Sequence, residues 1–112
     1  MKVNDLKEYS RSIDIVVKVV SRGEVRAVYR ESNDAMHRVA GFLVGDDSGC
    51  IVLTLWDDAI DSVEAGDVLR IPNGYVSVYR GSLRLNVGRY GSFEFLDSDP
   101  IGNVNLKNNL SE

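Results

Sequence analysis

The strongest constraint on the fold is the alternation of side chains in residues 74–88, GYVSVYRGSLRLNVG. Aliphatic and polar residues alternate with a period of two on both sides of Arg80-Gly81, which is the period of a β-strand. We therefore predict two antiparallel strands joined by a turn at Arg80-Gly81, either a two-residue loop or a longer loop with an even number of residues, which keeps the same parity. The two-residue loop puts the polar side chains in three cross-strand pairs: Tyr79 with Ser82, Ser77 with Arg84, and Tyr75 with Asn86.

Three further strands are predicted upstream, at residues 13–20, 37–45 and 50–56, which are rich in β-branched and other apolar residues. The charged segment 21–36 is expected to be a break between the first two strands. Gly41 marks a bulge or bend in the second strand, and the DDSG sequence at 46–49 predicts a tight turn.

A short helix is predicted after the third strand, with Asp57 or Asp58 as its cap and an end near Val63, before Gly66. Residues 67–71 are extended and are expected to enter a turn at Pro72-Asn73-Gly74. Five strands with one short helix between the third and fourth is the element order of the OB-fold, a small Greek-key barrel. We therefore predict an all-β protein of this fold.

The length of 112 residues fits one domain, and 44% hydrophobic with 27% charged residues is typical of a globular protein. We place the OB-fold domain at residues 1–96, with residues 92–96 continuing the last strand. Residues 97–112 are polar and contain Pro100, which predicts a short tail with little structure of its own. Its apolar residues could instead dock on the barrel: Ile101, Val104, Leu106 and Leu110.

Strand parity divides the side chains between the barrel interior and the outer face. The predicted inward residues are aliphatic: Ile51, Leu53, Leu55, Val76, Val78, Leu83, Leu85 and Val87. Trp56, Tyr75 and Tyr79 then lie outside, with Thr54, Ser77 and Asn86 on the same face. Exposed aromatic rings beside arginine and amide groups suit unstacked nucleobases. The alternative is that these rings cover a loop or the tail.

The charges are segregated along the chain, although the net charge is −4. Residues 45–67 contain seven acids and no base: Asp46, Asp47, Asp57, Asp58, Asp61, Glu64 and Asp67. Residues 68–95 contain four arginines against Glu94 alone: Arg70, Arg80, Arg84 and Arg89. This distribution is compatible with a phosphate-binding face despite the negative sum.

The sequence offers little for catalysis, metal binding or membrane insertion. His37 is the sole histidine, Cys50 is the sole cysteine, and no glycine-rich phosphate loop is present. We therefore predict a protein that is not an enzyme and that holds neither a metal nor a cofactor. The chain lacks an apolar run of about eighteen residues and an apolar leader, so we expect a cytoplasmic protein without membrane contacts.

Residues 44–89 contain a set of short motifs in a fixed order: the turn GDDSG, the strand LTLW, the GD before the fourth strand, and GYVSVYRG followed by LRLNVG. In these motifs the segment resembles the simple single-OB, single-stranded DNA-binding proteins of archaea, their human relatives and replication protein A-like OB domains. This resemblance implies an OB-fold protein that binds single-stranded DNA with little sequence preference and protects it during replication, recombination or repair.

The resemblance implies that bases stack on Trp56, Tyr75 and Tyr79, the rings that parity already places outside. It also implies contacts from arginines near the first two strands, where the candidates are Arg26, Arg30 and Arg38. The complete set of predicted contact residues comprises Trp56, Tyr75, Tyr79, Arg84, Asn86, Arg80, Ser77, Thr54, Arg26 and Arg38.

The predicted partner is single-stranded DNA, bound by a monomer, with repair or replication proteins as candidate further partners. Two alternatives remain open at this stage: an OB-fold subunit that docks a protein through the same aromatic residues, and a single-stranded RNA binder. In the resembling family the tail is long and recruits partner proteins, whereas residues 97–112 form only a short segment.

Overall fold

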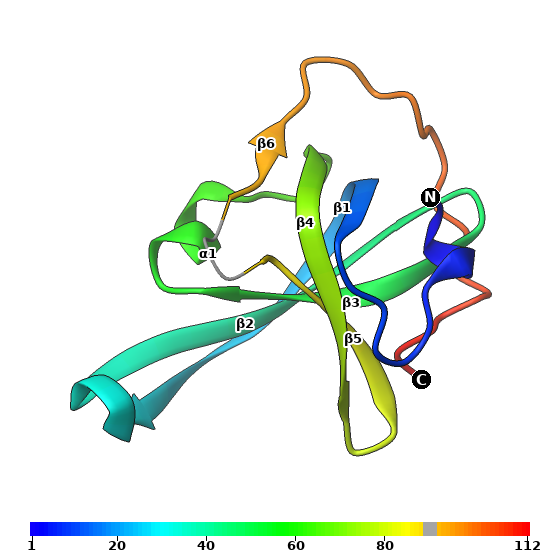
Figure 1. The fold of residues 1–112 in the computed structure, drawn as a ribbon. Coiled ribbons are helices and arrows are strands. Elements are labelled where there is room, and N and C mark those ends of the chain that lie inside the picture. Colours follow the sequence, from blue (N-terminus) through cyan, green and yellow to red (C-terminus); the bar gives the residue numbers. More distant parts are fainter. Residues whose placement is uncertain (89–91) are drawn as a thin grey trace.

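The computed structural model describes residues 1–88 and 92–112, and within these ranges the chain forms six strands (Figure 1). The strands are β1 (Ile13–Arg30), β2 (Ala35–Asp46), β3 (Gly49–Trp56), β4 (Val68–Tyr79), β5 (Ser82–Asn86) and β6 (Glu94–Phe95). The helical segments are η1 (Val3–Asp5), η2 (Glu31–Asn33) and α1 (Asp58–Ser62).

The sheet closes into a barrel because β1 pairs with both β2 and β4. Its strand order is β1-β2-β3-β5-β4-β6, and β3 and β5 are the parallel neighbours among otherwise antiparallel pairs. With α1 between β3 and β4, this arrangement is the predicted OB-fold. β6 pairs with Leu69 and Arg70 of β4, on the edge opposite β1, so the chain returns to β4 after β5 ends.

The predicted register of the β4–β5 hairpin is confirmed at every pair, from Tyr79 with Ser82 to Tyr75 with Asn86. Arg80 and Gly81 form the two-residue turn, with φ values of 51° and 81°. Two consecutive left-handed residues match the right-handed twist of the flanking strands. The turn therefore fixes which side chains of both strands face the core.

The barrel core contains most of the predicted inward residues. Five of them are at most 4% exposed: Ile51, Leu53, Leu55, Val76 and Leu85. Leu83 and Val87 are partly buried against this core. The prediction was wrong for Val78, which is 41% exposed. Val78 lies close to the turn of the β4–β5 hairpin, whose tip projects beyond the barrel (Figure 1).

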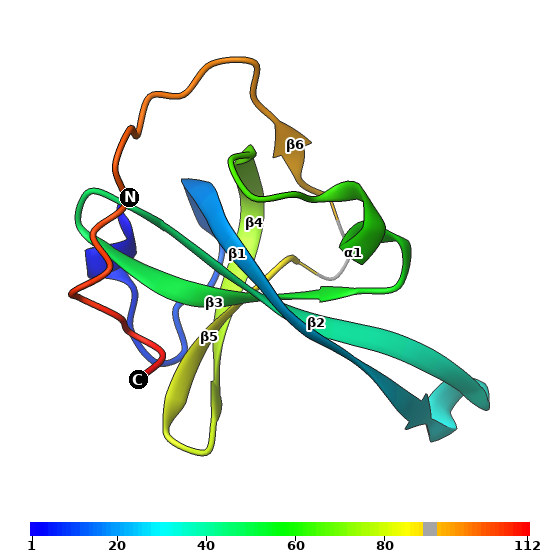
Figure 2. The same cartoon turned by 180° about the vertical axis from the view of Figure 1, so that it is seen from behind.

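The expected break at residues 21–36 was also wrong. β1 continues to Arg30, turns at η2 and pairs with β2, so that the two strands form a long arm projecting from the barrel (Figures 1 and 2). The charged residues that suggested a loop instead lie on a two-stranded ribbon with solvent on both sides. Such a ribbon needs no apolar face, and the alternation of a half-buried strand is therefore absent from it.

The predicted irregularity at Gly41 is present, although the extra residue lies in β1. The register shifts between Arg22 and Val25, opposite Gly41. A Cβ atom on Gly23 would lie 2.9 Å from the carbonyl oxygen of Gly41. The two backbones approach too closely for a side chain at Gly23, and the bulge bends β1 where it leaves the barrel.

Pro72-Asn73-Gly74 does not form the predicted turn, because β4 runs through it without interruption. Ile15 of β1 pairs with Ile71, but Ile13 pairs with Gly74, so one residue of β1 lies opposite two of β4. Pro72 occupies this bulge, where a missing backbone N–H is tolerated. The proline therefore bends the strand instead of ending it.

The short helix is confirmed as α1, but its predicted side-chain cap is not. Asp57 occupies the N-cap position without a capping hydrogen bond. Its carboxylate instead accepts the backbone N–H of Arg38 at 3.0 Å and lies 2.7 Å from Nδ1 of His37. The contact with His37, followed by the Arg38 N–H, lowers the pKa of Asp57. Asp57 thus fastens the end of β3 to β2.

The C-terminal segment docks on the barrel, which was one of the two alternatives for residues 97–112. Asn105 donates its backbone N–H to the carbonyl of Asp46, and Asn109 forms a parallel bridge with Cys50. Leu110 packs against the core, whereas Leu106 is exposed. Both chain ends lie on the side of the barrel away from the tip of the arm (Figures 1 and 2). The boundary between residues 96 and 97 stays a prediction.

The substitution Asp99→Asn is expected to lower stability at neutral pH and much less in acid. Asp99 accepts hydrogen bonds from Lys18 Nζ and from the N–H groups of Gly102 and Ile101, which lower its pKa from 3.8 to about 2. Its stabilising effect is present above the unfolded-state pKa and disappears as the pH falls towards the folded-state value. Thermal melts should therefore show a lower Tm for the variant at neutral pH and a much smaller difference near pH 2, where about half of the Asp99 carboxylate is protonated. An equal Tm difference at both pH values would contradict this account.

Candidate nucleic-acid interface

Three aromatic side chains lie on the outer face of the barrel, as strand parity predicts. Trp56 at the end of β3 is 37% exposed, Tyr75 of β4 is 42% exposed and Tyr79 is 48% exposed. The neighbouring core residue of β3, Leu55, points inward and is 2% exposed. The aliphatic residues fill the interior and leave the rings outside.

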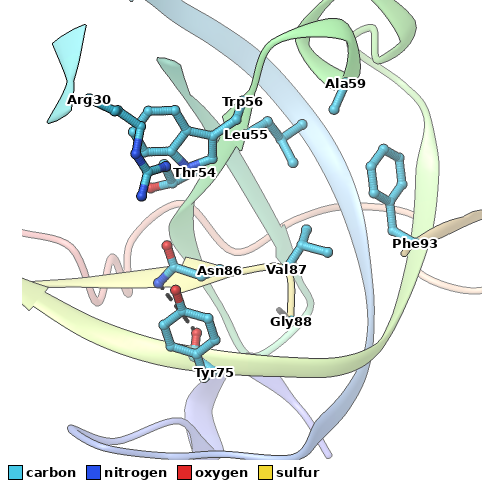
Figure 3. Close-up of a pocket in the computed structure, with 10 residues that line it drawn as sticks. All are labelled: Arg30, Thr54, Leu55, Trp56, Ala59, Tyr75, Asn86, Val87, Gly88 and Phe93. Atoms are coloured by element: carbon cyan, nitrogen blue, oxygen red, sulfur yellow. Dashed lines mark hydrogen bonds between the residues drawn. The ribbon is translucent and has the colours of Figure 1, made fainter. Parts of the chain in front are cut away.

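A hollow of about 300 Å³ separates Trp56 from Tyr75 (Figure 3). It is lined by Arg30, Thr54, Leu55, Trp56, Ala59, Tyr75, Asn86, Val87, Gly88 and Phe93. The Asn86 side chain lies between the two rings in Figure 3. Its Nδ2 donates to Ser77 Oγ at 2.9 Å and to the Arg84 carbonyl at 3.2 Å. The amide is therefore held in place at the centre of the outer face.

A second hollow of about 400 Å³ continues from the first, because both are lined by Thr54, Trp56 and Asn86. Its other lining residues are Arg26, Val28, Val39, Ser77, Tyr79 and Arg84. We call the two hollows together the groove. It crosses the outer face from the arm to the β4–β5 hairpin, and none of its described lining residues is acidic.

A third hollow adjoins the groove at Tyr75 and Gly88. Arg11, Ser12, Asn73 and Gly74 complete its lining. Arg11 lies in the segment before β1, so the alternation of side chains along strands could not predict its position. The outer face is therefore hollowed on both sides of Tyr75.

Arginines cover two of the three aromatic rings. The guanidinium carbon of Arg30 lies 4.9 Å from the centroid of Trp56, and Figure 3 shows the two side chains stacked. Arg80 and Arg84 lie 5.3 Å and 5.5 Å from the centroid of Tyr79. A cation over an exposed ring contributes about 0.5–1 kcal/mol, a weak interaction that a ligand can replace.

The arginines fall into two groups by their partners. Within the described ranges, no acidic side chain lies within ion-pair distance of the arginines that line the groove, Arg26, Arg30 and Arg84, or of Arg80 beside it. Arg38 and Arg70 instead bind acids. Arg38 contacts Asp61 at 2.7 Å and 3.0 Å, and Arg70 contacts Asp14 at 2.7 Å. These contacts lower the pKa of both carboxyl groups.

The structure brings together nine of the ten predicted contact residues. Eight of them line the groove: Trp56, Tyr75, Tyr79, Arg84, Asn86, Ser77, Thr54 and Arg26. Arg80 joins them at the hairpin turn through its stacking on Tyr79. Arg38 lies outside the groove and is paired with α1. The ion pair with Asp61 accounts for this, because it directs the guanidinium to the helix.

The sequence of the chain matches a known protein family. Residues 6–95 match the family described as single-stranded DNA binding protein Ssb-like, OB fold. The chain belongs to this family. It is 30% identical over 87 residues to the single-stranded DNA binding protein Ssb of Saccharolobus solfataricus, covering 78% of this chain and 57% of that protein. It is 36% identical over 100 residues to replication factor A of Methanothermobacter thermautotrophicus, covering 83% of this chain and 12% of that protein.

Solved structures similar to this Ssb-like domain include a hypothetical protein of Arabidopsis thaliana. That structure covers 99% of this chain and 81% of its own, with a TM-score of 0.82 and 28% identity. The second OB-fold domain of replication protein A from Methanococcus maripaludis covers 88% of this chain and 96% of its own, with a TM-score of 0.68 and 23% identity. At that identity the second likeness supports the fold alone.

Outside the groove, the features of the Ssb-like domain that bear on other kinds of site are its potential metal ligands, its cysteine and its helices. The structure shows no cluster of three potential metal-ligating side chains within residues 1–88 and 92–112. Cys50 is fully buried, and burial raises the pKa of its thiol. No helix in the described ranges is long and apolar enough to cross a membrane.

Several groove residues were not predicted from the sequence. Val28 and Val39 line the groove because β1 continues into the arm, where cross-strand pairing puts Arg26 and Val39 on one face. Because side chains alternate along a strand, Val28 would have been predicted on the same face as Arg26 if β1 had been extended to Arg30. Phe93 reaches the first hollow from the segment before β6, and no pattern in the sequence indicated this. Arg89 lies outside the described residues.

Removing the Arg30 side chain is expected to make the Trp56 ring more accessible in the free protein. Trp56 is the sole tryptophan, so its fluorescence reports this site alone. Acrylamide should quench Arg30→Ala more strongly than the wild type, because the guanidinium no longer covers the ring. Arg38→Ala is the matched control and should quench like the wild type. Equal quenching of all three proteins would show that Arg30 does not cover Trp56 in solution.

Proposed function

We propose that this protein binds single-stranded DNA along the groove, with bases stacked on Trp56, Tyr75 and Tyr79. The observation that carries the proposal is a continuous, acid-free groove with three exposed rings on an Ssb-like OB domain. Unpaired bases offer flat surfaces to the rings, and phosphates offer negative charge to the arginines. The relatives named for single-stranded DNA binding and replication support the same conclusion.

Binding of single-stranded DNA would replace arginine side chains with bases on the aromatic rings. In the free protein Arg30 lies on Trp56, and Arg80 and Arg84 lie on Tyr79. A base that stacks on Trp56 displaces Arg30, and one that stacks on Tyr79 displaces Arg80, so that each guanidinium becomes available for a phosphate. Arg84 stays beside Tyr79, because its Nε–H is bonded to Ser82. Base stacking contributes about 1–3 kcal/mol per base, more than the cation–ring contact that it replaces.

Little sequence preference is expected from this groove. Every base has an aromatic face, so stacking does not select among bases. The polar groups that reach base edges are few: Thr54, Ser77 and Asn86. The Nδ2 group of Asn86 is already hydrogen-bonded to Ser77. We therefore assign the protein a general role in covering single strands during replication, recombination or repair within the cell.

The negative net charge does not conflict with this proposal, because many acids are paired away from the groove. Asp61, Asp14 and Asp99 bind Arg38, Arg70 and Lys18. The groove arginines are free of acidic partners among the described residues. Affinity for single strands should fall by roughly 0.7 log units per tenfold increase in salt for each phosphate neutralised.

Alanine substitution of each aromatic residue tests the proposal. Trp56→Ala, Tyr75→Ala and Tyr79→Ala should each weaken binding to an oligothymidylate by about 1–3 kcal/mol, because one stacking surface is lost. The rings are partly exposed, so the variants should stay folded. Fluorescence anisotropy of a labelled oligonucleotide measures the affinity, and circular dichroism checks the fold.

Tyr29→Ala is the matched control, because Tyr29 is 53% exposed and alternates with Arg26, Val28 and Arg30 to the other face of the arm. It should bind like the wild type. A triple variant lacking all three groove rings that still binds with wild-type affinity would refute the stacking proposal. Tighter binding of oligouridylate than of oligothymidylate would make RNA the ligand, and no binding of either would favour a protein partner.

A further inference from the structure

The C-terminal segment fills the seam where β3 and β5 separate. The parallel pairing of these strands covers only Val52–Thr54 and Arg84–Asn86. Next to the start of this ladder, the backbone carbonyl of Cys50 accepts the N–H of Leu110 at 2.9 Å. The backbone N–H of Cys50 donates to the carbonyl of Asn108, also at 2.9 Å. Residues 108–111 therefore lie beside β3, joined to it by these hydrogen bonds and by the isolated bridge between Cys50 and Asn109.

The hydroxyl group of Ser111 joins the two separating strands. Its Oγ accepts the backbone N–H of Val52 on β3 at 2.9 Å and donates to the carbonyl of Leu83 on β5. The N–H of Ser111 donates to Oδ1 of Asn109 at 2.9 Å, which holds the backbone in this position. Ser111 thus forms hydrogen bonds with both β3 and β5 at the place where the two strands separate.

The same residue reaches the groove through Ser82. Ser82 Oγ donates to the backbone carbonyl of Ser111 and accepts Nε–H of Arg84 at 3.1 Å. Arg84 lines the groove and lies over the ring of Tyr79. Because the Ser82 hydroxyl has one hydrogen, the Ser111 carbonyl fixes its direction and leaves a lone pair for Arg84.

We propose that residues 109–111 are a positioning element of the nucleic-acid groove, which holds Arg84 over Tyr79 through Ser82. Arg84 is the contact residue, and Ser82 and Ser111 are positioning residues. This inference rests on the proposed function for its effect on binding. The hydrogen-bond relay itself does not depend on the identity of the ligand.

The anchoring of the segment makes this relay more than a chance surface contact. Leu110 packs on the hydrophobic core, and Asn108 Nδ2 donates to Asn4 Oδ1 and to the Ser48 carbonyl, both at 3.0 Å. Ser111 is therefore placed by apolar packing and by bonds to separate parts of the barrel. A long, flexible arginine loses less rotamer freedom on binding a phosphate when its Nε is already held.

The test compares Ser82→Ala, Ser111→Ala and Arg84→Ala in the full chain with oligothymidylate as the probe. Arg84→Ala should weaken binding and lower the salt slope by about 0.7, the value for one phosphate contact. Ser82→Ala should weaken binding by about three- to tenfold, the range for one lost hydrogen bond, and add little to Arg84→Ala in the double variant. Ser111→Ala, which keeps the carbonyl but loses the bridge, should show a smaller loss in the same direction.

A second readout follows Arg84 without any ligand. The Nε–H resonance of Arg84 in a proton–nitrogen NMR spectrum should shift in Ser82→Ala and, to a smaller extent, in Ser111→Ala. Ser82→Thr, which retains a hydroxyl group, should restore both the resonance and the affinity. Ser62→Ala is the matched control, because its hydroxyl bonds within α1, and it should change neither.

Two outcomes would overturn the inference. One is a Ser82→Ala variant with an unchanged Arg84 resonance and wild-type affinity, while Arg84→Ala binds weakly. The other is a Ser111→Ala variant that changes nothing although Ser82→Ala does, because the C-terminal segment would then play no part. Failure of the wild type to bind oligothymidylate would refute the proposed function, and the NMR comparison would still decide the relay.

Discussion

The pairing of β4 with β5 is the constraint on which the rest of this structure depends. Side chains alternate between the two faces of a strand, so a slip of one residue would exchange the faces completely. The turn at Arg80-Gly81 prevents this slip, since both residues adopt left-handed conformations and close a two-residue loop. Val76 and Leu85 consequently enter the core while Tyr75 and Tyr79 stay outside. The exposed rings are thus a direct consequence of burying the aliphatic residues.

The charge of the outer face depends on which carboxylates form ion pairs away from the groove. An acidic protein can present a basic face if its carboxylates are bound elsewhere, and here α1 and the C-terminal segment contribute Asp61 and Asp99 to ion pairs with Arg38 and Lys18. Four arginines without acidic partners among the described residues lie in or beside the groove: Arg26, Arg30, Arg80 and Arg84. Local pairing therefore matters more than net charge for what the face can attract.

The sequence predicted those features that local alternation determines. The hairpin register, the outward rings, the short helix and the OB-fold are confirmed. The errors arose where tertiary structure overrides a local signal. Residues 21–30 of β1 are exposed except for the half-buried Val28, so the alternation that marks a strand is absent there. The bulge opposite Ile13 and Ile15 accommodates Pro72 within β4. Asp57 bonds to β2 instead of its own helix, and Arg30 reaches Trp56 only because the arm exists.

The most direct test of the account is a titration of the free protein with an oligothymidylate at two salt concentrations, followed by the fluorescence of Trp56. Because Trp56 is the sole tryptophan, a base that stacks on it must alter this signal. The account predicts saturable quenching, with an affinity that decreases at the higher salt concentration. Unchanged fluorescence at low salt, in protein shown to be folded, would contradict the placement of single-stranded DNA in the groove.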